Sequence, residues 1–179
     1  MHNKNCLFFT GIKHSGKTTF ARMVAESLDM HFRDADQLIL DKTKAESIRK
    51  FFIENGKERF MDAELSSCVE YIGSNDNFIL SLGGGAADNT RLMDALKENG
   101  TIIYLSRDES DILPVILKNG IPPFLDKDNP EASFHTLYTK RDSIYRKYAD
   151  LVIELGPYGD KNETRIKIEN ALKENGYGL

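Results

Sequence analysis

The segment GIKHSGKTTF, residues 11–20, has the pattern of a loop that holds phosphate groups. Four of its residues match the motif G-x-x-x-x-G-K-[ST], namely Gly11, Gly16, Lys17 and Thr18. The apolar run CLFFT, residues 6–10, precedes the motif, and an amphipathic helical pattern opens at its lysine. A strand, a glycine-rich loop and a helix in this order are the context in which the motif binds nucleotide phosphates, so a chance match in a turn is disfavoured.

The residue types of this loop suit a bound phosphate chain. Glycine lets the backbone curl with its N–H groups pointing at phosphate oxygens, and the start of the helix adds positive potential. We expect Lys17 to span the β and γ phosphates and the Thr18 hydroxyl to ligate Mg²⁺. The residues predicted to bind the nucleotide are Gly11, Lys13, His14, Ser15, Gly16, Lys17, Thr18 and Thr19.

Apolar runs alternate with amphipathic segments along the rest of the chain. Further runs are NFILSL at 77–82, TIIYLS at 101–106 and DLVIEL at 150–155. Helical patterns fall at 17–28, 57–72, 90–98, 109–118, 133–148 and 164–174. The alternation predicts an α/β fold with a mainly parallel sheet, and 179 residues are the length of one domain, residues 1–179.

One irregular segment stands out, KNGIPPFLDKDNPEAS at residues 118–133. It contains three of the five prolines and separates two predicted helices. Such a segment is either a lid over a binding site or an inert surface loop.

Composition excludes several classes of protein. A net charge of −4, from 24 basic and 28 acidic residues, argues against a broad nucleic-acid interface. No apolar run approaches the ~20 residues of a membrane span, and the start MHNKNCLFF has no signal-peptide layout. Cys6 and Cys68 form no CxxC pair, and the four histidines show no metal-ligand spacing. We therefore expect a cytoplasmic protein with two reduced thiols and no structural metal. We also expect a monomer rather than an oligomer.

A pair of aspartates in FRDADQLI, residues 32–39, can supply the acid that a magnesium site needs. Asp34 and Asp36 are two residues apart and point the same way if the backbone is extended. One could anchor the metal while the other accepts a proton from a substrate hydroxyl. The alternative is that Asp36 caps a short helix over 37–42.

The chain resembles the shikimate kinases, small P-loop kinases of the nucleoside monophosphate kinase fold. The resemblance covers most of the sequence. Beyond the phosphate loop it rests on FRDAD and on LGGGAADNTRLMDALKENGTIIYL at 82–105. It rests also on SIRKFFIENGKERFMDAE at 47–64, where the family reads close to I-x-x-I-F-x-x-x-G-E-x-x-F-R-x-x-E. The last stretch is TKRDSIYRKYADLVI at 139–153, where the family has an arginine before Y-R-x-x-A.

The resemblance implies a fold, a reaction and a set of site residues. The fold would have three α/β/α layers around a five-stranded sheet, with a lid. The reaction would transfer the γ-phosphoryl group of ATP to the 3-hydroxyl of shikimate, with Mg²⁺ bound. Asp34 would serve the metal and Asp36 would hold the acceptor hydroxyls and act as base. Gly83, Gly84 and Gly85 would line the acceptor pocket and Arg141 would grip the shikimate carboxylate; a tight turn and a solvated helix residue are the plainer alternatives for these.

Three arginines that the resemblance leads one to expect are replaced. A second carboxylate-binding arginine falls on Met61, a lid arginine on Pro122, and an adenine-stacking arginine near Pro114 or Val115. Lys57, one helical turn before Met61, is a candidate for substrate binding that supplies a point charge in place of a guanidinium fork. Lys13 could reach the acceptor or the γ-phosphate from the opposite side.

These replacements keep three functions open. The chain is a shikimate kinase with an altered grip, a kinase for another polyhydroxy compound such as a sugar acid, or a nucleotide-binding protein that has lost efficient transfer. A missing lid cation favours the last, because a cation on the transferring phosphoryl group is worth roughly 10³ to 10⁵ in rate. An intact Lys17, Thr18 and Asp34 favour an enzyme.

Overall fold

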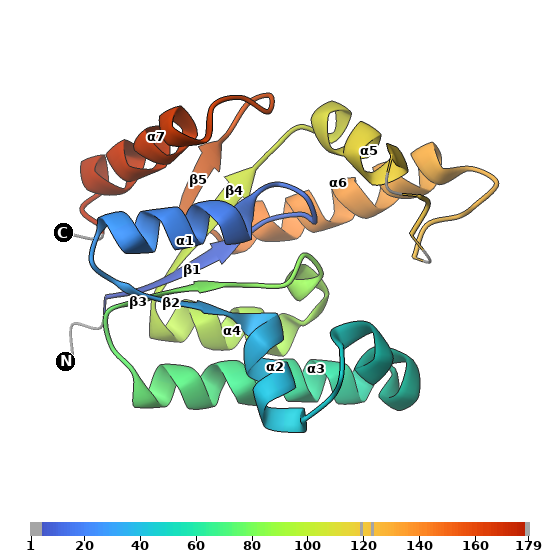
Figure 1. The fold of residues 1–179 in the computed structure, drawn as a ribbon, viewed down its shortest axis with the longest axis horizontal. Coiled ribbons are helices and arrows are strands. Elements are labelled where there is room, and N and C mark those ends of the chain that lie inside the picture. Colours follow the sequence, from blue (N-terminus) through green and yellow to red (C-terminus); the bar gives the residue numbers. More distant parts are fainter. Residues whose placement is uncertain (1–4, 119, 123, 178–179) are drawn as a thin grey trace.

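A computed structural model describes residues 5–118, 120–122 and 124–177, and shows a central sheet between layers of helices (Figure 1). The elements follow in the order β1 (Cys6–Thr10), α1 (Lys17–Ser27), β2 (His31–Asp34), α2 (Ala35–Thr43), α3 (Ile48–Ser74), β3 (Phe78–Ser81), the 3₁₀ turn η1 (Ala86–Asp88), α4 (Thr90–Asn99), β4 (Thr101–Ser106), α5 (Glu109–Lys118), α6 (Pro130–Tyr148), β5 (Leu151–Glu154) and α7 (Lys161–Glu174).

The sheet has five strands in the order β2-β3-β1-β4-β5, and every neighbouring pair is parallel. β1 lies at the centre, paired with β3 on one side and β4 on the other. Parallel strands end at the same edge of a sheet, so the loops that follow β1 and β3 lie next to each other. The predicted α/β fold with its five-stranded parallel sheet is confirmed.

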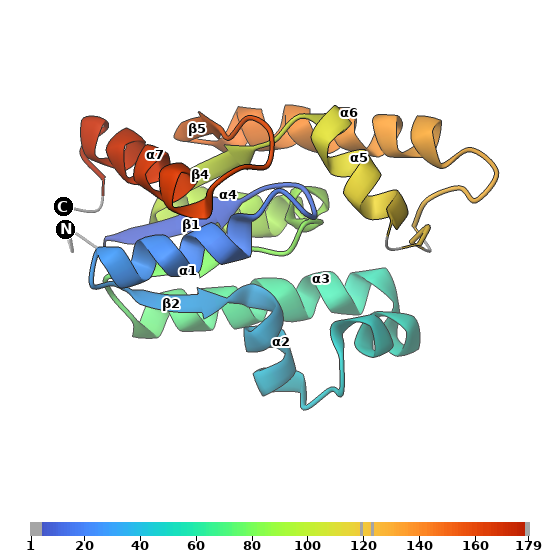
Figure 2. The same ribbon diagram turned by 45° about the horizontal axis from the view of Figure 1, so that its top comes forward.

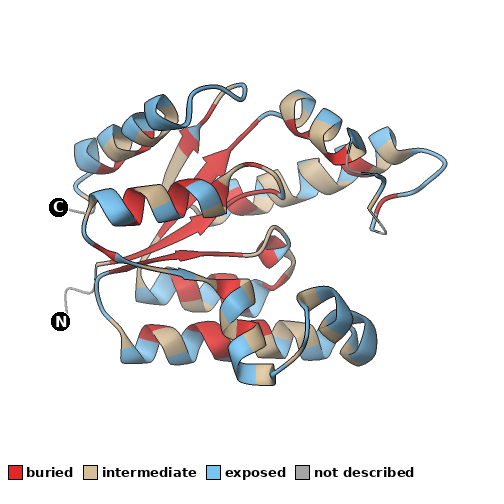
Figure 3. Cartoon of the chain, in the orientation of Figure 1, coloured by how far each residue is buried: buried red, intermediate tan, exposed pale blue. Residues whose placement is uncertain are grey.

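Strand β1 is buried on both faces, which explains its uninterrupted apolar sequence. Cys6 and Phe8 belong to one core, and Leu7 and Phe9 to the other, as the two-residue period of a strand requires. The second core is closed by α1 and α7, which lie together on one face of the sheet (Figures 1 and 2). Buried residues accordingly run along the strands and the inner sides of the helices (Figure 3).

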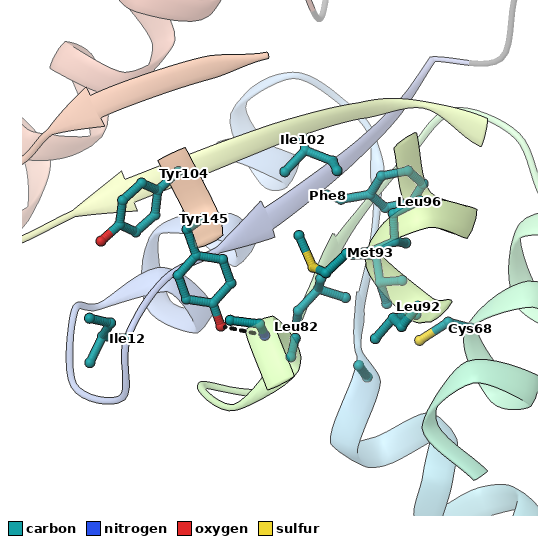
Figure 4. Close-up of a cluster of buried hydrophobic side chains, with 14 of the residues drawn as sticks. Phe8, Ile12, Cys68, Leu82, Leu92, Met93, Leu96, Ile102, Tyr104 and Tyr145 are labelled. Atoms are coloured by element: carbon teal, nitrogen blue, oxygen red, sulfur yellow. Dashed lines mark hydrogen bonds between the residues drawn. The ribbon is translucent and has the colours of Figure 1, made fainter. Parts of the chain in front are cut away.

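The first core contains a buried tyrosine that connects α6 to the loop after β3. The Tyr145 ring is fully buried and lies 5.2 Å from that of Tyr104. The Ala87 backbone N–H donates to its hydroxyl at 3.3 Å, and the hydroxyl donates in turn to the Gly84 carbonyl at 3.2 Å. Figure 4 shows the Tyr145 ring next to Tyr104, with its hydroxyl directed toward the side where Leu82 lies. The α6 helix therefore holds the loop after β3 in place.

Most predicted elements are found within three residues of their expected ends, and two helical segments were missed. The α2 helix starts at Ala35, where we considered only a short helix over 37–42, and α3 begins at Ile48, well before the predicted residue 57. Gly56, with φ 77° and ψ 174°, interrupts α3, so that the predicted helix corresponds to its second part. A glycine with positive φ separates the two parts because other residues adopt this conformation at a cost.

The candidate lid, residues 118–133, includes 119 and 123, which lie outside the described residues. In its described part the Leu125 N–H donates to the Pro122 carbonyl at 3.0 Å and the Leu125 side chain is buried. The α6 helix starts inside the segment, at Pro130, with Asn129 as its N-cap. Asparagine at the N-cap and proline at the next position are signals of a helix start, which place the end of the irregular segment at 129.

Two glycines give opposite expectations for stability. A Cβ at residue 100 would lie 2.5 Å from the Cys6 carbonyl oxygen, whereas one at residue 73 would meet nothing within 4 Å. Gly100→Ala should lower the free energy of unfolding by about 1–3 kcal/mol because strand β1 must shift. Gly73→Ala, in helical backbone, should raise it by about 0.5–1 kcal/mol. Chemical denaturation measures both, and equal effects of the two substitutions would contradict the packing described at β1.

Candidate active site

The loop between β1 and α1 is shaped to receive an anion. Gly16, at φ 97°, is the N-cap of α1, and no side chain caps the free N–H groups of this helix start. The Ser15 hydroxyl is buried and has no hydrogen-bond partner among the described residues. Unsatisfied donors are rarely buried in proteins, so their presence in this loop fits phosphate oxygens as the missing partners.

Lys17 is a buried cation directed to the same place. Its side chain is 8% exposed and makes no ion pair within 4 Å among the described residues. Burial lowers the pKa of Lys17 to about 8, while the carboxylates of Asp36 and Asp34 act in the opposite direction. An ammonium group buried without a close counterion is stabilised by a bound anion, which is the task predicted for this lysine.

Two other residues of the phosphate loop, His14 and Lys13, are predicted to bind the nucleotide, and their surroundings differ. His14 adopts a left-handed conformation, with φ 69°, and its carbonyl accepts from the Tyr158 hydroxyl at 2.8 Å. Burial and the charges of Lys13 and Lys17 lower the pKa of His14, so the imidazole is neutral at pH 7. The Lys13 side chain lines a cavity on the side of the loop after β3.

A second group of polar atoms surrounds the Thr18 hydroxyl. It donates to Asp34 Oδ2 at 3.3 Å and lies 3.0 Å from the Ser81 hydroxyl at the end of β3. These are oxygen ligands, the kind that Mg²⁺ prefers, and Mg²⁺ uses one or two carboxylates together with substrate phosphates and water. Among the described residues no group of three His, Cys, Asp or Glu side chains is placed to hold a metal ion.

The two aspartates do not lie on one extended segment as the sequence suggested. Asp34 ends β2 with extended backbone and is the N-cap of α2, and its Oδ1 accepts from the Asp36 N–H at 2.9 Å. Asp36 lies inside the first turn of α2, so the expectation of a shared extended backbone was wrong and the helix cap is the other aspartate. Burial first, and then the charge of Asp34, raise the pKa of Asp36, which suits a group that exchanges protons.

The three consecutive glycines after β3 form a floor along which three charged residues are arranged in order. A Cβ at Gly83 would lie 3.2 Å from Asp36 Oδ1, and one at Gly84 would lie 2.8 Å from the Lys13 nitrogen. At Gly85 the nearest atom would be Arg141 Nη2 at 3.3 Å. A side chain at residue 84 would collide with the Lys13 backbone, whereas one at residue 83 or 85 would push the end of the Asp36 or Arg141 side chain away by a few tenths of an ångström.

Arg141 is held at its end of the floor by an acid that sequence reasoning did not single out. Its Nη2 and Nε donate to Asp88 Oδ2 at 2.7 and 3.2 Å, and Nη1 donates to the Gly84 carbonyl at 3.2 Å. Lys140 lies 3.3 Å from the other Asp88 oxygen. The hydrogen bonds of Arg141 hold the pKa of Asp88 below its usual range although burial acts against them.

A cavity of about 190 Å³ lies beside the glycine floor. It is lined by Ile12, Lys13, Gly84, Gly85, Ile116, Phe124, Phe134, Leu137 and Arg141. These residues come from the phosphate loop, the glycine floor, α5, the segment before α6, and α6 itself. The lining is apolar except for two cations, so the cavity favours a small anionic molecule with apolar parts.

Two predicted acceptor-side positions on α3 differ in their surroundings. Lys57 is exposed at the start of the second part of the helix, and its role in substrate binding stays a prediction. Met61 is half-buried, and its carbonyl accepts from the Asn89 side chain at 3.0 Å. Pro114 and Val115 lie within α5.

Sequence reasoning missed residues whose partners lie far away along the chain. Arg107 is buried and donates from Nε to the Ser15 carbonyl at 3.2 Å and from Nη1 to the Gly156 carbonyl. Its guanidinium lies 4.0 Å from the Tyr158 ring centre. Ser81 was also missed, although a polar residue at the carboxyl end of an apolar strand is a signal that could have found it.

Glu64, on α3, is a further missed group. It is 2% exposed and accepts from the Asn89 side chain at 2.9 Å. A Cβ at Gly83 would lie 3.7 Å from its Oε1, so this carboxyl faces the same glycine as Asp36. Burial raises the pKa of Glu64 to about 7, and the charges of Asp36 and Asp88 add to the rise.

The raised pKa of Glu64 predicts a pH dependence of stability. Its ordinary value is 4.5, so the folded protein binds more protons than the unfolded chain between about pH 4.5 and 7. The stabilising contribution is full below pH 4.5 and is lost as the pH rises through 7. Glu64→Gln should therefore raise the free energy of unfolding at pH 8, by up to about 3 kcal/mol, and change it little at pH 5.

Urea denaturation at both pH values tests this expectation. Asp62→Asn is the matched control, because Asp62 is two residues away on α3 with an exposed side chain that pairs with Arg91. A gain of stability at pH 8 no larger for Glu64→Gln than for Asp62→Asn would contradict the burial of an uncompensated carboxyl group.

Comparisons with known proteins agree with this geometry. The sequence model of the shikimate kinase family matches residues 13–166. The shikimate kinase of Burkholderia lata is 36% identical over 150 residues, which are 84% of this chain and 80% of that protein. The shikimate kinase of Psychrobacter sp. is 33% identical over 168 residues, 94% of this chain and 92% of that protein.

Solved structures extend the likeness to the fold. The shikimate kinase of Acinetobacter baumannii, in complex with shikimate, is 29% identical and superposes with a TM-score of 0.84 over 97% of this chain and 96% of that chain. The shikimate kinase of Aquifex aeolicus, 23% identical with a TM-score of 0.75, shares the fold. None of the described helices is long and apolar enough to span a membrane.

Proposed function

The chain belongs to the shikimate kinase family, and on this basis we propose that it transfers the γ-phosphoryl group of ATP to the 3-hydroxyl of shikimate. Members of this family are ATP-dependent phosphotransferases with an alcohol group as acceptor. The proposal includes the site residues, magnesium as the metal and the cytoplasm as the compartment.

The observation that carries the proposal is the order of charged groups along the glycine floor. Asp36 lies at Gly83 and Arg141 at Gly85, and the cavity is bordered by Gly84, Gly85 and Arg141. A hydroxy acid on this floor would turn a hydroxyl toward Asp36 and its carboxylate toward Arg141. Shikimate has both groups on one small ring, and it is bound in the Acinetobacter baumannii structure.

The residues around this acceptor would divide the work of transfer. Lys17 and the free N–H groups at the start of α1 would hold the phosphates of ATP. Asp36 would accept the proton of the attacking hydroxyl. Its raised pKa makes the carboxylate a stronger base, as proton acceptance requires. Arg141 would orient the ring through the carboxylate with charge-assisted hydrogen bonds.

Thr18, Asp34 and Ser81 would hold the metal through their oxygens. When bound, Mg²⁺ neutralises charge on the β and γ phosphates. The three oxygens lie at the ends of α1, β2 and β3, so the fold itself brings them together.

Replacing each aspartate by asparagine separates the two proposed roles. Asp34→Asn keeps an oxygen for the α2 cap but removes a charge, so the Mg²⁺ concentration at half-maximal rate should rise about tenfold. Asp36→Asn should lower kcat by about 10²- to 10⁴-fold at saturating Mg²⁺, because the base is lost. Magnesium titrations of ATP-dependent turnover measure both quantities, and indistinguishable titration curves with equal kcat losses would refute the division.

The acceptor is tested with purified protein, ATP and a panel of shikimate, a sugar acid and an uncharged polyol. We expect the largest kcat/KM for shikimate, because only an acid uses Arg141 and the ring must fit a cavity of about 190 Å³. Arg141→Met should raise the KM for shikimate by about ten- to a hundredfold, the loss expected for one charge-assisted hydrogen-bonded partner. It should leave the rate with the polyol unchanged.

Other outcomes select the alternatives. A tenfold higher kcat/KM for the sugar acid or the polyol would identify that compound, in place of shikimate, as the acceptor. This outcome is tested because Met61 and Pro122 stand where arginines were expected. ATP binding by calorimetry without transfer to any compound would make the chain a nucleotide-binding member of the family.

A further inference from the structure

The cavity beside the glycine floor has two charged residues in its lining, Lys13 and Arg141, and both are cations. They differ in what surrounds them. Arg141 gives two of its donors to Asp88, so its charge is largely compensated. Among the described residues no carboxylate lies within ion-pair distance of Lys13. Lys13 therefore presents an uncompensated positive charge to the cavity.

The backbone of Lys13 is fixed relative to both binding loops. It belongs to the phosphate loop, and its nitrogen, Cα and Cβ would lie 2.8 to 3.1 Å from a Cβ at Gly84. This contact places the residue between Asp36, at Gly83, and Arg141, at Gly85. The Nζ atom lies 5.7 Å from the ring centre of Phe124, in the segment before α6. The side chain thus runs along the cavity from the glycine floor toward the segment before α6.

Lys13 lies between the two groups that would hold the nucleotide and the acceptor. Lys17, the proposed phosphate ligand, belongs to the same loop, four residues further along the chain. Asp36, the proposed base, lies at Gly83, next to the glycine against which the Lys13 backbone packs. Pro122, in the segment where an arginine was expected, offers no charge there.

The geometry points to Lys13 as the cation that contacts the phosphoryl group during its transfer, taking the place of an arginine from the lid segment. This inference rests on the proposed function, because it needs the phosphoryl group to move from the nucleotide to an acceptor on the glycine floor. The bond between the γ-phosphorus and the bridging oxygen of ATP breaks, and a bond to the acceptor oxygen forms. The hydroxyl proton goes to Asp36, and Lys13 offsets the charge on the phosphoryl oxygens throughout.

Lys13→Met tests the inference, because methionine keeps the length of the side chain and removes the charge. We expect kcat for the acceptor to fall about 100-fold, as for the loss of one preorganised donor to a transition-state oxygen. The KM values for ATP and shikimate should change less than about threefold, because the contact is made to the moving group. Lys13 is exposed, so the melting temperature should not change.

Lys147→Met is the matched control. Lys147 is also exposed and also lies 5.7 Å from an aromatic ring centre, that of Tyr148 on α6. The variant loses one positive charge and one lysine–aromatic contact, and it should keep kcat within twofold. A double variant, Lys13→Met with Pro122→Arg, should regain at least about tenfold in kcat if the missing quantity is a cation over the phosphoryl group.

A binding measurement separates contact with the phosphoryl group from a structural role. Calorimetric titration with the phosphorylated acceptor should show at least tenfold weaker binding to Lys13→Met than to the native chain, while shikimate binds both equally. Native kcat in Lys13→Met, or a raised KM for shikimate with native kcat, would overturn the inference. So would equal affinity of the two proteins for the phosphorylated acceptor.

Failure of the proposed function gives a different pattern. If the native chain prefers another acceptor, the same comparison is made with that acceptor, and a native kcat in Lys13→Met again overturns the inference. If it phosphorylates none, ADP with aluminium fluoride serves as the probe, because the fluoride complex occupies the position of the moving group. Tighter retention of ADP by the native chain than by Lys13→Met supports the role of Lys13, and equal retention refutes it.

Discussion

The site depends on the direct contact between two backbones, those of the phosphate loop and the glycine floor. The loop after β1 and the loop after β3 leave neighbouring parallel strands, so they emerge side by side. At Gly84 there is no room for a side chain, since a Cβ would lie 2.8 Å from the Lys13 nitrogen. Tyr145 and Arg141 of α6 fix the floor from below by donating to the Gly84 carbonyl. The loops proposed to hold the nucleotide and the acceptor are thereby packed directly against each other, an arrangement that transfer between them would require.

The parts of the fold that follow from local pattern were predictable. The strand, loop and helix around Lys17 follow from the motif. β1, β3, β4 and β5 follow from short apolar runs, and those of β1, β3 and β4 are almost wholly buried in the sheet. The start of α2 could not be predicted from local pattern, because β2 alternates between exposed and half-buried residues and passes directly into the helix. An aspartate before a helix is a good cap, and reading Asp34 in that role would have moved Asp36 onto the helix.

The missed site contacts have a common physical cause. The partners of Arg107, Glu64 and Arg141 are backbone or side-chain atoms 92, 25 and 53 residues away in the chain. Such pairs form only after the sheet order brings their strands and helices together, and no spacing in the sequence encodes them. For Lys13 the sequence predicts a phosphate-loop residue that could reach the acceptor or the γ-phosphate, but the contact of its backbone with Gly84 is known only from the fold.

The replacement of an expected arginine by Met61 becomes understandable from the carboxyl group one helical turn later. Met61 and Glu64 are three residues apart on α3, so an arginine at 61 would have stood beside Glu64 as a counterion. Without it, burial raises the pKa of Glu64 to about 7, so the carboxyl group is partly protonated at neutral pH, and it accepts a hydrogen bond from Asn89. The loss of the arginine is thus accompanied by a partial loss of negative charge at Glu64. With one cation fewer on the acceptor side, the proposed binding of an anion would depend on the remaining cations, Arg141 and Lys13.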